Sequence, residues 1–99
     1  MQNRYDKSTE DLCRALLSLQ SKEECMAFLE DICTIKEIQD ISQRLEVAKL
    51  LSQGVSYTAI CKETGASTAT ISRVSRSYEY GAGVYKAVIA RLNEEDDNA

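Results

Sequence analysis

Histidine and proline are both absent from the sequence, and only four of its 99 residues are glycines. Without histidine or a glycine-rich phosphate loop, few of the side-chain combinations used in acid–base or nucleophilic catalysis remain. Without proline, no helix is forced to break by a missing backbone N–H group. These absences argue against an enzyme.

Long apolar stretches are missing as well. No run approaches the roughly 18 residues that a membrane-spanning helix needs. The polar N-terminus, MQNRYDKSTED, lacks the apolar segment of a secretory signal peptide. We therefore expect a cytoplasmic protein with no membrane partner.

The four cysteines, Cys13, Cys25, Cys33 and Cys61, form no C-x-x-C pair. A structural zinc site would need closely spaced pairs of ligands. Each cysteine lies in or beside an apolar stripe of helical period, where a free thiol acts as a small hydrophobic side chain. The spacing therefore predicts no metal site.

The formal net charge of −4 argues against a nucleic-acid partner, which normally faces a basic surface. The acidic residues, however, are concentrated toward the two ends of the chain. Residues 54–80 carry three basic and two acidic side chains. This middle segment is mildly positive, so the charge balance weakens the case for DNA binding without excluding it.

Apolar periodicity and capping residues predict an all-α protein. A first helix begins at Ser8 or Thr9, and a second begins at Ser21 with the capping-box sequence S-K-E-E. Thr34 opens a third helix with a second capping box, and Gly54 ends it. That helix would be about 30 Å long, so we expect it to share a core with a second copy.

The length of the chain predicts a single domain over residues 1–99. We divide it into dimerisation helices, a helix-turn-helix, a C-terminal helix and a disordered acidic tail. These parts span residues 8–53, 56–78, 84–93 and 94–99, respectively.

A helix-turn-helix pattern follows Gly54. Ser56 can cap a short helix that Gly65 ends, and Ser67 or Thr68 can cap the next one. Wrapping the second helix at about 100° per residue separates two arcs. The inward arc holds Ile71, Val74, Ser75 and Tyr78, and the outward arc holds Ala69, Ser72, Arg73 and Arg76.

The outward arc is short, polar and cationic, so it could enter a major groove and approach base edges closely. The alternative is a surface helix that happens to be rich in alcohols. Because Ser and Thr are poor helix formers, covering an exposed face with them costs stability, which favours a binding role.

Two blocks of sequence, RLEVAKLLSQG and GASTATISRVSR, resemble the Trp repressor superfamily, specifically its YerC/YecD-type branch. The similarity extends from about Thr34 to Leu92. It implies an intertwined, all-helical homodimer that regulates transcription, with its second short helix on operator DNA. By position, Thr68, Ala69 and Ser72 would lie near base edges, and Thr70 and Arg73 near phosphates.

Pattern and resemblance together predict a set of DNA-binding residues on the two short helices. They are Ser56, Thr58, Lys62, Ser67, Thr68, Ala69, Thr70, Ser72, Arg73 and Arg76. Thr58 and Cys61 stand where Trp repressors carry basic residues, so we expect fewer phosphate contacts and a weaker dependence on salt.

The resemblance also implies an effector site. In Trp repressors two arginines enclose the indole of tryptophan; Arg44 and Arg73 occupy those positions here, and Thr34 matches a third ligand-site residue. The glycine that follows the second arginine in that family is replaced by Val74. A β-branched side chain there should fill the space of the ring, so we expect no tryptophan cofactor.

Arg44 has an alternative role, an ion pair with Asp40 or Glu37. The sequence thus predicts a dimeric, sequence-specific DNA-binding regulator of the repressor type, with any small-molecule effector unknown. A helical protein-interaction module with weak or no DNA binding is the alternative, and the negative net charge favours it.

Overall fold

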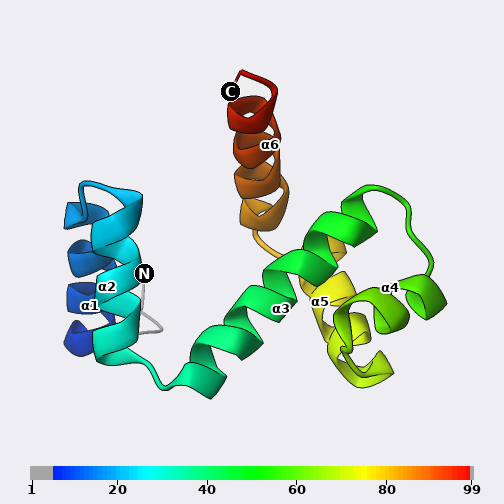
Figure 1. Ribbon diagram of the computed structural model, residues 1–99, viewed down its shortest axis with the longest axis horizontal. Helices are drawn as coiled ribbons and strands as arrows, with labels where there is room; N and C mark the ends of the chain where they lie inside the picture. Colours follow the sequence, from blue (N-terminus) through cyan, green and yellow to red (C-terminus); the bar gives the residue numbers. More distant parts are fainter. Residues whose placement is uncertain (1–5, 99) are drawn as a thin grey trace. The chain divides into compact units, whose positions relative to one another are not determined.

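A computed structural model describes residues 6–98, and that range contains six helices and no strand (Figure 1). The helices are α1 (Lys7–Ser18), α2 (Lys22–Ile32), α3 (Ile35–Ser52), α4 (Tyr57–Thr64), α5 (Thr68–Tyr80) and α6 (Val84–Asp97). The all-α prediction is confirmed. None of these helices is both long and apolar enough to cross a bilayer.

The chain divides into two compact units between Ile38 and Gln39, within α3. No residue of α1 or α2 is buried, although the structure describes both helices completely. Each unit is described separately below.

The first unit begins α1 earlier than predicted. Asp6, not Ser8 or Thr9, is the N-cap, and its Oδ1 atom accepts a hydrogen bond from the Thr9 N–H at 3.0 Å. The hydroxyls of Ser8 and Thr9 donate to the same carboxylate. These bonds, the Thr9 backbone bond foremost, lower the pKa of Asp6. A carboxylate that gathers several donors fixes the helix start.

The capping box predicted at Thr34 is confirmed in full, and that at Ser21 is confirmed for the bond to the Ser21 hydroxyl. The Glu24 N–H donates to Ser21 Oγ at 3.0 Å, while Glu24 Oε1 accepts from the Gln20 N–H, one residue before the cap. At the start of α3, the Glu37 N–H donates to Thr34 Oγ1 at 3.1 Å, and the Thr34 N–H donates to Glu37 Oε1 at 2.8 Å.

The second unit has its own hydrophobic core, to which α3, α4, α5, α6 and the turn between α4 and α5 contribute. The buried apolar residues are Val47, Ala48, Leu50, Ile60, Ala66, Ile71, Val74 and Ile89. Val47, Ile60 and Ile71 are fully buried, so they anchor α3, α4 and α5 to one another. This core fixes the helix-turn-helix to the longest helix.

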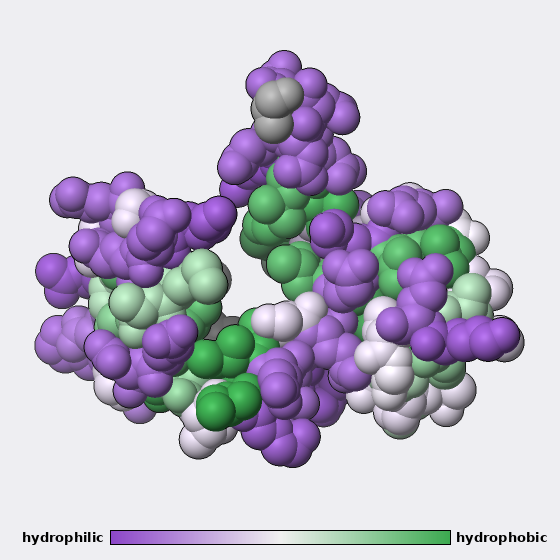
Figure 2. Space-filling view, viewed as in Figure 1, coloured by the Kyte–Doolittle hydropathy of each residue, from purple (hydrophilic) through white to green (hydrophobic). Residues whose placement is uncertain are grey.

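The C-terminal helix is longer than predicted. α6 continues through Asp97 with Asn98 as its C-cap, so the predicted disordered tail is wrong for residues 94–97; Ala99 lies outside the described residues. Nothing after Gly83 breaks the helix, and extending an existing helix costs little for good helix formers such as Glu. Figure 2 shows hydrophobic residues at the start of α6 and hydrophilic ones over its C-terminal part.

Candidate nucleic-acid interface

The sequence predicts an N-cap for each of the two helices of the helix-turn-helix, and the structure forms both. The Ala59 N–H donates to Ser56 Oγ at 3.2 Å, and the Thr70 N–H donates to Ser67 Oγ at 3.1 Å. Gly65 ends α4 in the left-handed region, with φ 73°, and a Cβ there would meet nothing within 4 Å. Backbone conformation, not crowding, therefore requires the glycine.

Two side chains that are absent from the predicted site, those of Thr64 and Gln43, hold the turn in place. The Thr64 hydroxyl donates to the Ile60 carbonyl at 2.7 Å and accepts from the Ala66 N–H at 3.1 Å. From α3, the Gln43 amide donates to the Thr64 carbonyl at 3.1 Å. The Thr64 bonds are local and follow from a threonine next to the glycine, but the Gln43 bond spans 21 positions and leaves no local signal.

The inward side of α5 matches the prediction. Ile71 is fully buried and Val74 is 2% exposed, both within the core of the second unit. Ser75 and Tyr78 are half-buried, and the Lys86 ammonium lies 5.1 Å from the centre of the Tyr78 ring. The cation–π contact joins α5 to α6 beside the core.

The predicted DNA-contacting side chains lie on the outer surface of the helix-turn-helix. Thr70 is half-buried, and the exposed ones are Ser56, Thr58, Lys62, Ser67, Thr68, Ala69, Ser72, Arg73 and Arg76. We call these residues, with Thr70, the α4–α5 face. The structure thus brings the predicted set together on one pair of packed helices.

The charges of the α4–α5 face suit an anion. Neither α4 nor α5 carries an acidic residue in its first turn, where backbone N–H groups also attract negative charge. Within the described part of the chain, no ion pair involves Lys62, Arg73 or Arg76. All three cations are therefore free to meet phosphates.

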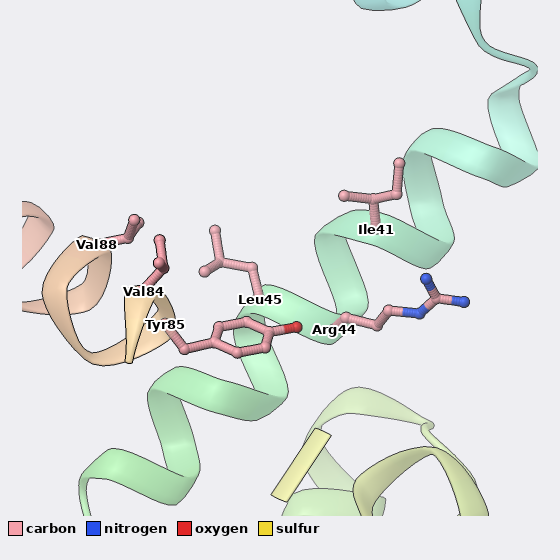
Figure 3. A pocket seen from close by; sticks show the side chains of 6 residues that line it. All are labelled: Ile41, Arg44, Leu45, Val84, Tyr85 and Val88. Carbon is pink, nitrogen blue, oxygen red and sulfur yellow. The ribbon is translucent and has the colours of Figure 1, made fainter. Parts of the chain in front are cut away.

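Of the two predicted effector arginines, only Arg44 lines a cavity of the second unit. A cavity of about 470 Å³ in the second unit is lined by Ile41, Arg44, Leu45, Val84, Tyr85 and Val88, from α3 and α6 (Figure 3). Arg73 does not line it; that side chain lies on the exposed side of α5. Thr34 belongs to the first unit, where its hydroxyl caps α3.

Arg44 makes no ion pair with any described residue, so the alternative pairing with Asp40 or Glu37 is not formed. Its guanidinium extends away from Val84 and Val88 (Figure 3). The cavity wall between α3 and α6 is therefore mainly apolar.

The four cysteines, all within the described residues, are free thiols. Cys61 is half-buried and packs against the core, as expected of a small hydrophobic side chain, whereas Cys13 is exposed on α1. No group of three or more metal-ligating side chains occurs among residues 6–98.

Comparison with known proteins gives consistent results. The model of the Trp repressor protein family matches residues 7–93. The "uncharacterized protein YerC" of Bacillus subtilis (strain 168) is 49% identical over 90 residues, which cover 91% of this chain and 86% of that protein.

Two solved structures also resemble the chain with a TM-score of 0.85 each. A "putative Trp repressor" from Staphylococcus aureus is 47% identical, with 90% of this chain and 89% of that one covered. A "TrpR like protein" from Eubacterium eligens ATCC 27750 is 50% identical, with 89% and 91% covered.

Proposed function

The chain belongs to the Trp repressor family, and from this premise we propose that it is a dimeric, sequence-specific DNA-binding regulator of transcription that performs no catalysis. The observation that carries the proposal is the α4–α5 face. There the inward side of α5 is anchored by Ile71 and Val74, while the outward side is exposed, short and cationic.

This surface has the chemistry needed to read a major groove. Small side chains at Thr68, Ala69 and Ser72 allow the helix backbone to approach the base edges. Threonine and alanine methyls can contact thymine methyls, and hydroxyls can donate or accept hydrogen bonds. Arg73 and Arg76 can bind guanine edges or phosphates.

Homodimerisation is supported by apolar surface that a single chain leaves open. Leu17 and Met26 in the first unit are 86% and 55% exposed, and Ile41 and Val84 in the second are 54% and 60% exposed. Large exposed apolar side chains of this kind mark surfaces that a partner covers. Two copies would present their α5 helices about 34 Å apart, to successive major grooves of a near-palindromic operator.

Tryptophan is not part of the proposed mechanism. Val74 fills its place in the core, and Arg73 projects from the exposed side of α5. A planar ring between Arg44 and Arg73 would require the valine side chain to move out of a packed interior. Regulation through another effector, or through none, is compatible with this arrangement.

Selection of binding sites from random duplex DNA tests the proposal. We expect enrichment of a two-fold symmetric sequence at low salt. Ser72→Ala and Arg76→Ala should each weaken binding to the selected operator while the dimer persists in sedimentation. Arg91→Ala removes an exposed cation of α6, outside the α4–α5 face, and should bind like the wild type.

Failure to enrich any sequence at low salt, with no retention on heparin, would refute the proposal. It would favour instead a helical dimer that docks on another protein. Normal operator binding by both Ser72→Ala and Arg76→Ala would show that the α4–α5 face is wrongly assigned.

A further inference from the structure

The last residue of α5, Tyr80, is 86% exposed, which is unusual for an aromatic side chain. It is not among the DNA-binding residues predicted from the sequence. Tyr80 lies about three helical turns after Ala69 and about two turns after Arg73, so it falls on the same side of α5 as these residues. It therefore continues the α4–α5 face to the end of the helix.

The direction of Tyr80 is fixed by the helix. The Gly81 N–H donates to the Ser77 carbonyl at 2.9 Å, so helical hydrogen bonding continues past Tyr80. Gly81 allows this ending because a Cβ at that position would overlap the carbonyl oxygen of Ser77. The exposed ring is thus held on an ordered final turn.

The length of α5 places its final turn beyond the bases. A helix of 13 residues is about 20 Å long, whereas the major groove is about 12 Å wide. A recognition helix contacts base edges mainly with its N-terminal residues. With Thr68 and Ala69 in the groove, the other end of α5 reaches the groove rim, where the sugar–phosphate backbone runs.

We propose that Tyr80 is a further DNA contact whose phenolic hydroxyl donates a hydrogen bond to a phosphate at the rim of each half-site. This inference rests on the proposed function. Tyrosine is one of the side chains that hydrogen-bond phosphates in protein–DNA complexes. Because residues 54–80 contain only three basic residues, a neutral donor here adds affinity that the few cations do not supply.

A neutral donor has a signature that separates it from a cation. It releases no condensed counterion, so it adds affinity without adding to the salt dependence of binding. Arg73 and Arg76, by contrast, should contribute to the affinity and also to its salt dependence. Comparing tyrosine and arginine variants across a salt series therefore distinguishes the two kinds of contact.

The test measures operator affinity of the full-length dimer by fluorescence anisotropy at several salt concentrations. Tyr80→Phe, which keeps the ring and removes the hydroxyl, should lower affinity by about ten- to a hundredfold, because one solvent-exposed hydrogen bond of ordinary net strength is lost in each copy. The slope of log K against log salt should stay at the wild-type value. Tyr85→Phe removes the hydroxyl of a half-buried tyrosine on α6 and should bind like the wild type.

A neutral methylphosphonate at each rim phosphate of the operator provides a second readout. The wild type should bind this DNA less tightly than the unmodified operator. The methylphosphonate should lower the affinity of Tyr80→Phe by a smaller factor, because that variant has already lost the hydroxyl that donates to the phosphate. Wild-type affinity in Tyr80→Phe, or a loss explained by dissociation of the dimer, would overturn the assignment of Tyr80. An absence of operator binding by the wild type would instead refute the proposed function.

Discussion

The salt dependence of operator binding follows quantitatively from the number of cations on the α4–α5 face. Each protomer offers Lys62, Arg73 and Arg76, all exposed and free of ion pairs with other described residues. A dimer therefore neutralises at most six phosphates with them. At about −0.9 per phosphate, log K should fall with log salt at a slope no steeper than roughly −5.4.

Arg76→Ala removes two of the six cations from the dimer and should reduce the slope to about −3.6. Between 50 and 200 mM salt, affinity would then fall roughly 150-fold, compared with roughly 2,000-fold for the wild type. Fluorescence anisotropy with a labelled operator measures both slopes. Arg91→Ala, on α6, serves as the control and should keep the wild-type slope.

Two results would refute this reasoning. A wild-type slope much steeper than −6 would mean that cations outside the α4–α5 face reach the DNA. An unchanged slope in Arg76→Ala would mean that this guanidinium does not contact a phosphate, and that its role is base recognition or none.

Three further predictions concern the fold and the effector. Gly65→Ala should destabilise the protein by about 1–2 kcal/mol and lower its thermal midpoint by several degrees, because alanine is strained in the left-handed backbone conformation even where its Cβ meets no neighbour. Gly54→Ala, at φ +77° and equally uncrowded, should have the same effect. Unchanged thermal midpoints would contradict the left-handed conformation of both turns. Calorimetry with tryptophan should give no heat of binding, since Val74 is packed in the core, and a clear heat would disprove the steric argument. The folded-state pKa of Asp6 is lowered, so its capping contribution is present above the ordinary value of 3.8 and is lost as the pH falls through the folded pKa. An NMR titration of Asp6 should therefore show a midpoint below 3.8, and a midpoint at or above that value would contradict the cap.

Caps and turns could be predicted from the sequence because their signals are local. Each N-cap hydroxyl accepts from an N–H group only three residues later, so a capping pattern can be recognised within four consecutive residues. This holds for Ser21, Thr34, Ser56 and Ser67. The same local pattern gave the wrong start for α1. Asp6, not Ser8 or Thr9, is the cap, and the hydroxyls of those two residues donate to its carboxylate.

Features that depend on distant residues could not be predicted in the same way. The Gln43 amide reaches the Thr64 carbonyl only because α3 and α4 pack together, and no local pattern connects the two residues. The cavity beside Arg44 likewise depends on how α6 returns to α3. Composition gave a wrong prediction at residues 94–97: the acidic run indicated disorder, but α6 continues through Asp97 because no residue there breaks the helix.

Recognition and core packing are carried by different residues of the helix-turn-helix. The side chains that hold α5 in place, Ile60, Ile71 and Val74, are buried in the core of the second unit. The residues of α5 proposed to meet DNA project from its opposite side, and no residue of the α4–α5 face belongs to that core. Ser56 and Ser67 of that face are also helix caps. Because surface substitutions away from caps and packing change stability little, the face can vary in sequence and select a different operator without loss of the fold. Arg76 and Tyr80 are thus accessible to mutation as probes of binding alone, whereas Ile71→Ala would remove the support on which any readout by α5 depends.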